Sequence, residues 1–202
     1  MNADTDSIYE ELWRLLEEGS SNRRHPFHTP VLATSMSSGD PDLRTVVLRR
    51  VDRGRRLVCC HTDARSPKVG EIRSSNRVAW LFYDPKARVQ IRAHGRCEIH
   101  QGPADAMAQE TWHKVRPDSR VCYSAPHSPS SVLDRWESNQ AADARDIAST
   151  KPMADDKPPV TFAVLATVLD SVEWLELHHD GHRRIRFSID GDSSPKVQWL
   201  AP

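Results

Sequence analysis

Short β-type stretches separated by turn signals run through most of the chain, and this feature most constrains its fold. Gly39-Asp40, Asp52-Arg53-Gly54 and Asp84-Pro85 supply turns at hairpin spacing. The sequence contains no alternation of strands with long helices and no internal repeat. This order predicts a mainly β fold, a β-barrel with peripheral helices, rather than a parallel doubly wound sheet. The predicted strands span residues 31–36, 43–51, 56–61, 78–83, 88–100, 161–168, 171–179, 183–189 and 197–200.

Helical signals lie before and between these strands. Ile8, Leu12 and Leu15 recur at three- and four-residue spacing, which predicts an amphipathic helix over residues 7–18. Shorter helices are expected at 66–74, 104–115 and 131–144, and the polar segment 145–159 predicts a flexible loop. A chain of 202 residues suits a single domain, in which residues 1–26 form an N-terminal helix and loop.

Charge and cysteine content exclude several classes of function. Lys+Arg and Asp+Glu both number 28, so no net field attracts nucleic acid or an anionic membrane. The apolar runs are far shorter than the roughly 20 residues of a membrane-spanning helix, and the acidic N-terminus is unlike a signal peptide. The four cysteines show no CxxC spacing and are interpreted as reduced thiols. We therefore expect a cytoplasmic protein with no nucleic-acid or membrane partner.

Cations gather at the ends of otherwise apolar strands. Arg44 and Arg49 bracket the apolar run 46–48, and the loop after the next strand ends in Ser66 and Lys68. Taken singly, such a cation is more often solvated, and an isolated tryptophan such as Trp174 more often lies in the core. Grouped cations instead indicate an anionic ligand.

A second polar group lies in the turn predicted at residues 178–182. His178, His179 and His182, with Asp180, could bind a metal ion such as zinc. A turn rich in histidine and aspartate is more often simply polar, so we expect no metal site.

Several segments together resemble the pyridoxamine 5′-phosphate oxidase family, whose members are FMN-binding split β-barrels. RTVVLR at 44–49 resembles the arginine-led flavin strand of that family, and HTDARSPK at 61–68 is similar to its aromatic-Thr loop ending in Ser-Arg-Lys. VQIRAHG at 89–95 resembles its glutamine-containing strand. VEWLELHHDGHRRIRF at 172–187 resembles its C-terminal tryptophan and His-x-Arg segment, and WLAP at 199–202 its usual end. The resemblance spans residues 27–202.

The resemblance implies an FMN-dependent oxidoreductase that acts on a small substrate. Arg44, Ser66 and Lys68 would bind the FMN phosphate, and Gln90 with the backbone of 46–48 would meet the isoalloxazine edge. In the family, the C-terminal tryptophan and arginine reach FMN from the other subunit, which implies a homodimer with FMN sites at the subunit interface. The implied cofactor-binding residues are Arg44, Val46, Val47, Leu48, Arg49, His61, Thr62, Ser66, Lys68, Gln90, Trp174 and Arg184. No catalytic acid or base is assigned, because flavin chemistry is largely that of the cofactor.

Departures from the family pattern bear on the substrate. Pro67 replaces a phosphate-binding arginine, Arg49 replaces the strand lysine of the oxidases, and Asp180 replaces a substrate-phosphate arginine. Segment 111–128 loosely resembles their Tyr/Arg/Ser substrate segment. These changes favour a divergent, oxidase-related subgroup whose substrate is unidentified. A true pyridoxamine 5′-phosphate oxidase and a non-catalytic flavin or haem carrier are the alternatives.

Overall fold

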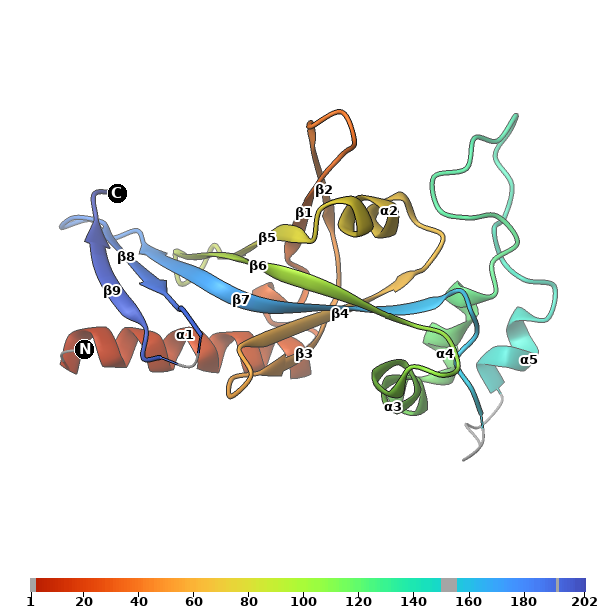
Figure 1. Cartoon of the computed structure of the whole chain (residues 1–202), viewed down its shortest axis with the longest axis horizontal. Helices are drawn as coiled ribbons and strands as arrows, with labels where there is room; N and C mark the ends of the chain where they lie inside the picture. Colours follow the sequence, from red (N-terminus) through yellow and green to blue (C-terminus); the bar gives the residue numbers. More distant parts are fainter. Residues whose placement is uncertain (1–2, 150–155, 192) are drawn as a thin grey trace.

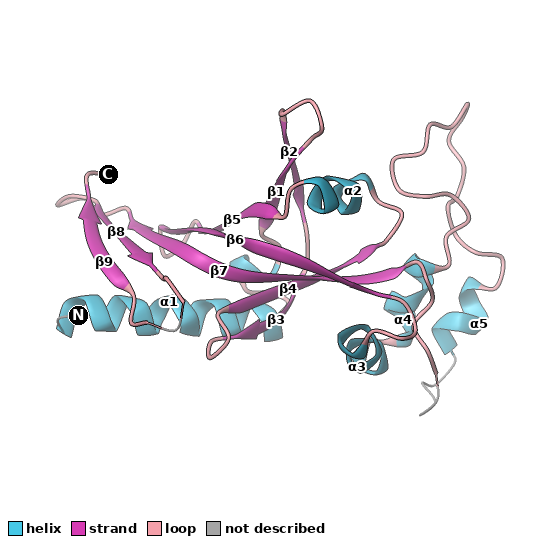
Figure 2. Ribbon diagram, viewed as in Figure 1, coloured by secondary structure: helices cyan, strands magenta, loops and turns pink. Residues whose placement is uncertain are grey.

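One antiparallel sheet forms the framework of the protein, as the mainly β prediction requires (Figures 1 and 2). The computed structural model describes residues 3–149, 156–191 and 193–202. Along the main path the strand order is β2-β1-β5-β6-β7-β4-β3, and β8 pairs with both β7 and β9. The strands are β1 (Val31–Ser35), β2 (Pro41–Thr45), β3 (Leu48–Asp52), β4 (Leu57–Asp63), β5 (Arg77–Asp84), β6 (Val89–Gln101), β7 (Phe162–Glu176), β8 (Arg183–Ser188) and β9 (Lys196–Leu200).

The segment predicted as one strand at 43–51 is divided in the structure. Thr45 ends β2, which pairs with β1, whereas Leu48 begins β3, which pairs with β4. Between them, the Val46 N–H donates to the Pro30 carbonyl at 2.9 Å. Strands β2 and β3 lie at opposite ends of the sheet path, yet only two residues separate them. The sheet must therefore curl until its two end strands approach each other, which gives a barrel whose end strands β2 and β3 do not pair in the described chain.

The two longest strands, β6 and β7, cross the middle of the molecule and pair over most of their length. The strands predicted at 161–168 and 171–179 are thus a single strand, with Asp170 inside it. A bulge between His94 and Gly95 allows this pairing to continue. A Cβ atom at position 95 would lie 2.2 Å from the Val168 carbonyl oxygen, so the close approach of β6 and β7 requires glycine.

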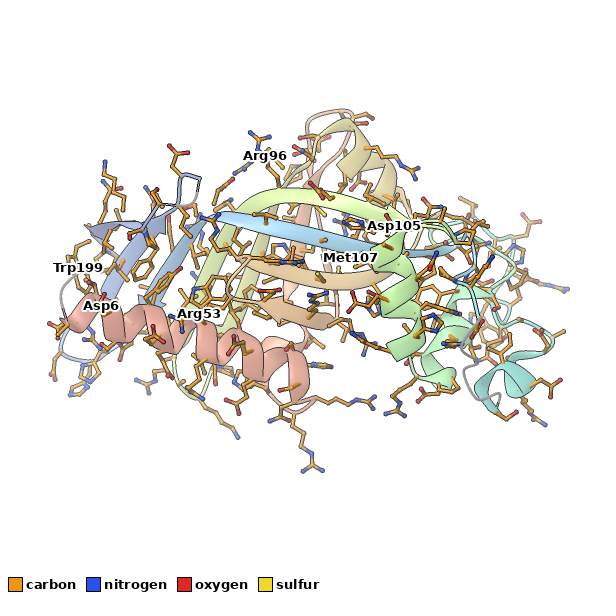
Figure 3. All side chains as sticks on the ribbon, turned by 60° about the horizontal axis from the view of Figure 1, so that its bottom comes forward. Asp6, Arg53, Arg96, Asp105, Met107 and Trp199 are labelled. Atoms are coloured by element: carbon orange, nitrogen blue, oxygen red, sulfur yellow. The ribbon has the colours of Figure 1, made fainter. Side chains whose placement is uncertain are left out.

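Helix α1 (Ala3–Ser21) covers the main core, and the amphipathic prediction for this region is confirmed. Leu12, Trp13 and Leu16 are fully buried on its inner face. On its outer face, Arg53 from the β3–β4 turn forms an ion pair with Glu10, which ties the helix to the barrel (Figure 3).

The remaining helices are short. They are α2 (Pro67–Ser74), α3 (Ala106–Lys114), α4 (Pro117–Arg120) and α5 (Ala144–Ser149), with 3-10 turns at Pro26–His28 and Val121–Tyr123. Trp112 of α3 packs against Phe162 of β7 in a second, smaller core. None of the helices in the described ranges is long and apolar enough to cross a membrane.

The helix predicted at 131–144 is absent: residues 131–143 form an irregular arm instead. Val132 and Trp136 in this arm are 97% and 90% exposed. An amphipathic helix needs an apolar surface to cover it, and the fold offers these residues none within the described chain. The predicted loop at 145–159 begins instead with α5, and residues 150–155 lie outside the described ranges.

Candidate functional site

The first group of predicted site residues forms a cationic cradle at the start of α2. The Lys68 ammonium donates to the Ser66 hydroxyl at 2.5 Å and to the Thr62 hydroxyl at 3.2 Å. Ser66 occupies the N-cap position of α2, but its side chain makes no capping hydrogen bond. The positive end of the helix dipole therefore adds to the charge of Lys68. Hydroxyls, an ammonium and a helix N-terminus are the donor set that a phosphate group requires.

Arg44 lies beside this cradle and is held by acidic neighbours. Its guanidinium pairs with Glu71 at 3.1 Å and with Asp42, and it donates to the Thr34 hydroxyl at 2.5 Å. Burial, followed by the nearby charge of Arg44, lowers the pKa of Lys68. The cradle thus contains two cations and two carboxylates. An incoming phosphate would replace a carboxylate as the partner of Arg44, and Asp42 is the more exposed of the two.

A second group lies on the other face of the sheet. Gln90 pairs with Leu175, and Leu175 pairs with Arg184, so these three side chains share one face of β6, β7 and β8. Gln90 also pairs with the exposed Tyr83. We call this surface, defined by Tyr83, Gln90, Leu175 and Arg184, the outer face.

Arg44 faces the opposite way. It pairs with Leu32, and Leu32 pairs with Trp80, both of which are buried in the main core. Trp80 and Tyr83 lie three residues apart on β5, so their side chains point to opposite faces of the sheet. The structure therefore separates the predicted cofactor residues: Arg44 lies with the inner group and Gln90 with the outer group.

Trp174 joins neither group. It is 5% exposed, pairs with Ile91 and Ile185 in the main core, and its Nε1 has no hydrogen-bond partner among the described residues. This placement does not support the predicted contact of Trp174 with FMN. The outward position next to Gln90 and Arg184 belongs to Leu175, one residue later in the strand.

Arg49 and His61 line a cavity of about 500 Å³ between strands β3 and β4 and helices α3 and α4. Burial, followed by the charge of Arg49, lowers the pKa of His61 to about 4, so its imidazole is neutral at pH 7. The cavity also receives further cations, from Arg50, Lys114 and Arg116, and one carboxylate, from Glu110. Its apolar walls are Cys59, Met107, Val115 and Val164, of which Met107 is marked on α3 in Figure 3.

Arg116 and Ser119, which the residue-by-residue prediction did not include, come from the α3–α4 segment that lines this cavity. Arg120 fixes the segment: its guanidinium donates to the carbonyls of Val115 at 3.1 Å and Trp112 at 2.7 Å. The same group lies over the Trp112 ring at 4.3 Å. The signal for these residues was the loose likeness of segment 111–128 to a substrate-binding segment.

Of the other predicted residues, Val46 and Val47 lie between β2 and β3, outside the strand ladder, and Leu48 is fully buried. The buried side chain of Leu48 leaves only its backbone to meet a ligand, whereas Val46 and Val47 are half-buried.

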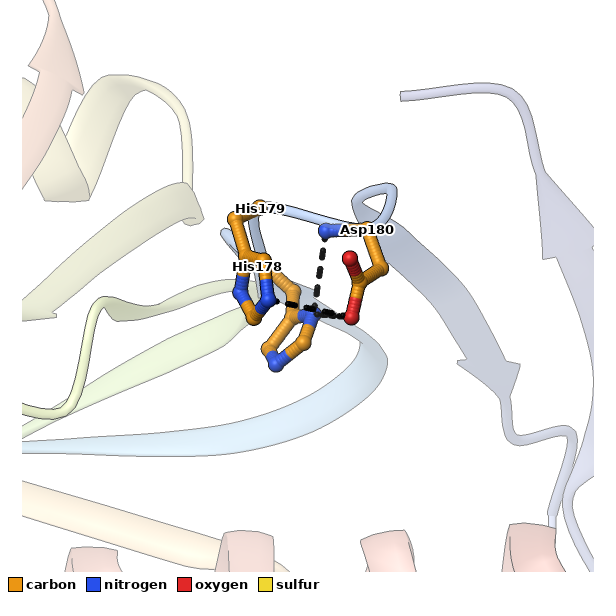
Figure 4. Close-up of side chains that lie close together, drawn as sticks. All are labelled: His178, His179 and Asp180. Carbon is orange, nitrogen blue, oxygen red and sulfur yellow. Dashed lines mark hydrogen bonds and ion pairs between the residues drawn. The ribbon is translucent and has the colours of Figure 1, made fainter.

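The histidine-rich turn between β7 and β8 forms a cluster on the surface (Figure 4). Asp180 lies 3.1 Å from Nε2 of His179 and 3.6 Å from Nδ1 of His178, and its backbone N–H donates to His178. All three side chains are largely exposed. The polar groups of the turn thus have partners within the turn itself. The absence of a metal site here stays a prediction.

A curled antiparallel sheet with a cationic cradle on one face is the architecture of the flavin-binding split barrels. Residues 10–101 match the family described as pyridoxamine 5′-phosphate oxidase, FMN-binding domain. A pyridoxine/pyridoxamine 5′-phosphate oxidase from Novosphingobium aromaticivorans is 28% identical over 203 residues, which cover 100% of this chain and 95% of that protein. The corresponding protein of Coxiella burnetii is 38% identical over 68 residues, 34% of each chain.

Solved structures show the same fold. A pyridoxamine 5′-phosphate oxidase-related, FMN-binding protein from Nostoc punctiforme superposes with a TM-score of 0.74 at 19% identity and covers 96% of both chains. PhzG from Burkholderia lata superposes with a TM-score of 0.73 at 21% identity and covers 100% of this chain and 98% of its own. Residues 10–101 thus match the FMN-binding domain of the pyridoxamine 5′-phosphate oxidase family, the chain as a whole has the fold of the split-barrel proteins, and the cofactor is FMN.

Proposed function

We propose that this protein is a cytoplasmic FMN-dependent oxidoreductase that acts, as a homodimer, on a small anionic substrate. The observation that carries the proposal is the division of the cofactor residues between the two faces of one sheet. Lys68 and Arg44 lie on one side, and Gln90 and Arg184 on the other. One FMN can use both groups only when two copies of the chain bring opposite faces together.

The outer face has the composition of a surface that another chain covers. Leu43, Leu81 and Tyr83 are large apolar side chains that are exposed there. A groove of about 280 Å³ runs between Leu43, Leu81 and Gln90. Exposed apolar groups around a few polar ones are typical of a protein interface. A second copy of the chain would bury them and bring its own cradle to the face.

In this dimer the chain binds and orients FMN from two sides. Lys68, Ser66, Thr62 and the start of α2 would hold the phosphate, with Arg44 beside them. The backbone of 46–48 and the partner subunit's Gln90 would meet the flavin ring, and the partner subunit's Arg184 would place positive charge near it. FMN, when bound, supplies the ring that accepts a hydride.

The cavity beside Arg49 is the proposed substrate site. Its cations outnumber its single carboxylate, and its walls are apolar, so it suits an anion with an apolar body. His61, neutral at pH 7, can donate or accept one hydrogen bond there without adding charge. Turnover of pyridoxamine 5′-phosphate itself is the second candidate, because the cavity cations suit a phosphate ester and the curated relatives are oxidases of that substrate.

A titration with FMN and riboflavin tests the proposal. Flavin fluorescence, which is quenched on binding, gives the dissociation constant of each flavin. Riboflavin lacks the phosphate, so the dissociation constant of FMN should be at least tenfold lower than that of riboflavin, the least that one charge-assisted hydrogen bond contributes. The complex should bleach with a reductant and recolour in air. Equal affinity for both flavins would refute the phosphate cradle. If the protein binds no flavin but gains a Soret band with haem, it is a haem carrier.

A further inference from the structure

A buried carboxylate, Glu173, lies beneath three arginines on the outer face. Its side chain is 6% exposed. One oxygen accepts from Nη2 and Nε of Arg184 at 2.6 and 3.2 Å, and the other accepts from Nη2 and Nε of Arg186 at 2.6 and 2.8 Å. Nη1 of Arg92 lies 3.8 Å away. The three strands β6, β7 and β8 therefore place one anion at the centre of three cations.

Arg184 and Arg186 each bind a different oxygen of the Glu173 carboxylate. Each arginine presents Nε and Nη2 to a single oxygen, which fixes the plane of its guanidinium. Burial by itself raises the pKa of Glu173, but the hydrogen bonds from Arg184 and Arg186 outweigh it and hold the pKa below its usual value. The carboxylate therefore stays ionised at pH 7 and offsets one of the three positive charges.

Arg184 needs such a partner in order to act on a ligand. An arginine on a strand surface ordinarily samples many rotamers, and binding must then order it. The contacts with Glu173 order Arg184 in advance. They use Nε and Nη2, and a guanidinium has a third nitrogen, Nη1, with which to meet a ligand.

We propose that Glu173 is a positioning residue, which fixes the direction of Arg184 so that this guanidinium meets the FMN bound in the cradle of the partner subunit. The inference rests on the proposed function, in which Arg184 reaches across the interface. The neighbouring pair of Glu176 and Arg183, joined at 2.5 Å and more exposed, has no such role and provides a matched control on the same two strands.

A double-mutant cycle on FMN binding tests the proposal. The dissociation constant is measured by fluorescence quenching for the full chain, for Glu173→Gln, for Arg184→Ala and for the double variant, at concentrations where sedimentation shows the dimer. Arg184→Ala and Glu173→Gln should each weaken binding by about tenfold or more, the range of a charge-assisted hydrogen bond. The double variant should bind no more weakly than Arg184→Ala, because Glu173 acts through Arg184. Glu176→Gln should stay within about twofold of the unmodified protein.

The other outcomes distinguish the role of Glu173 from that of Arg184. Unchanged affinity in Glu173→Gln, or losses that add in the double variant, would refute the positioning role while leaving the flavin site intact. Unchanged affinity in Arg184→Ala would instead refute the role of Arg184 in the proposed function, and the inference with it. The melting temperature of each apoprotein checks folding. If Glu173→Gln does not fold, Glu173→Asp, which keeps the charge but shortens the reach, should show the same loss.

Discussion

Replacing His61 by glutamine should remove part of the acid sensitivity of this protein between pH 7 and pH 5. Burial and Arg49 lower the pKa of His61 to about 4 in the folded chain, whereas the ordinary value is 6.5. Between these values the unfolded chain binds a proton at this position that the folded chain does not, so stability falls as the pH falls through this window. From pH 6.5 to pH 5, at about 1.36 kcal/mol per unit, the loss is about 2 kcal/mol.

Urea unfolding of the apoprotein at pH 7 and pH 5, at one fixed protein concentration, measures this loss. The fall in unfolding free energy should be about 2 kcal/mol smaller in His61→Gln than in the unmodified chain, because the other titrating groups are common to both. His113, exposed on α3, is the matched control, and His113→Gln should leave the fall unchanged. An equal fall in all three proteins would show that the cavity does not keep His61 neutral.

Three further predictions concern the cofactor and the substrate. Lys68→Ala should weaken FMN binding by about 1.5–3 kcal/mol, whereas Lys86→Ala, in the exposed β5–β6 turn, should not; equal affinity in Lys68→Ala would make Lys68 a merely solvated cation. Dilution below the dimer dissociation constant should release FMN, and a monomer with full FMN occupancy in sedimentation would contradict the shared site. The unmodified protein should form little pyridoxal phosphate from pyridoxamine 5′-phosphate, and Asp180→Arg, in the β7–β8 turn that would reach the site from the partner subunit, should bind this ester better by about 1 kcal/mol, the low end for an exposed charge. Oxygen-dependent turnover by the unmodified protein at about 1 per second or faster would identify a true oxidase.

The sequence located most of the strands, but it gave no strand order. Alternating apolar residues located most of the strands, because one face of each packs on the core. The apolar run 46–48 does not mark the point at Val46 and Val47 where the chain leaves one end of the sheet path for the other. Likewise, the strands predicted at 161–168 and 171–179 are one strand, because the register shift between His94 and Gly95 accommodates Asp170 as an extra residue. Which strand lies beside which is decided by contacts far apart in sequence, and a local pattern does not contain them.

In the candidate site, too, a local sequence pattern indicates some residues, whereas the place of others depends on contacts far apart in sequence. Lys68 and Ser66, predicted from one family-like segment, lie together in the structure because they are neighbours in sequence, and their role in FMN binding stays a prediction. The contact of Trp174 with FMN stays a prediction: Trp174 points into the core, and a register difference of one residue reverses the face to which a strand side chain points. Arg116 was missed because its place beside Arg49 depends on how Trp112 packs on β7. Likewise, the arm at 131–143 has helical composition but finds no surface to fold against in the part of the chain that the structure describes.

The location of the two cofactor groups on opposite faces of one sheet has a genetic consequence. If each FMN takes its cradle from one chain and Arg184 from the other, two defective chains can complement each other. A chain without Lys68 and a chain without Arg184 would each form homodimers in which both sites bind FMN weakly. Mixed in equal amounts, half of their random dimers would be heterodimers, each with one site that has lost both residues and one that keeps both. About a quarter of all sites would then bind FMN normally, although neither parent chain has a complete one.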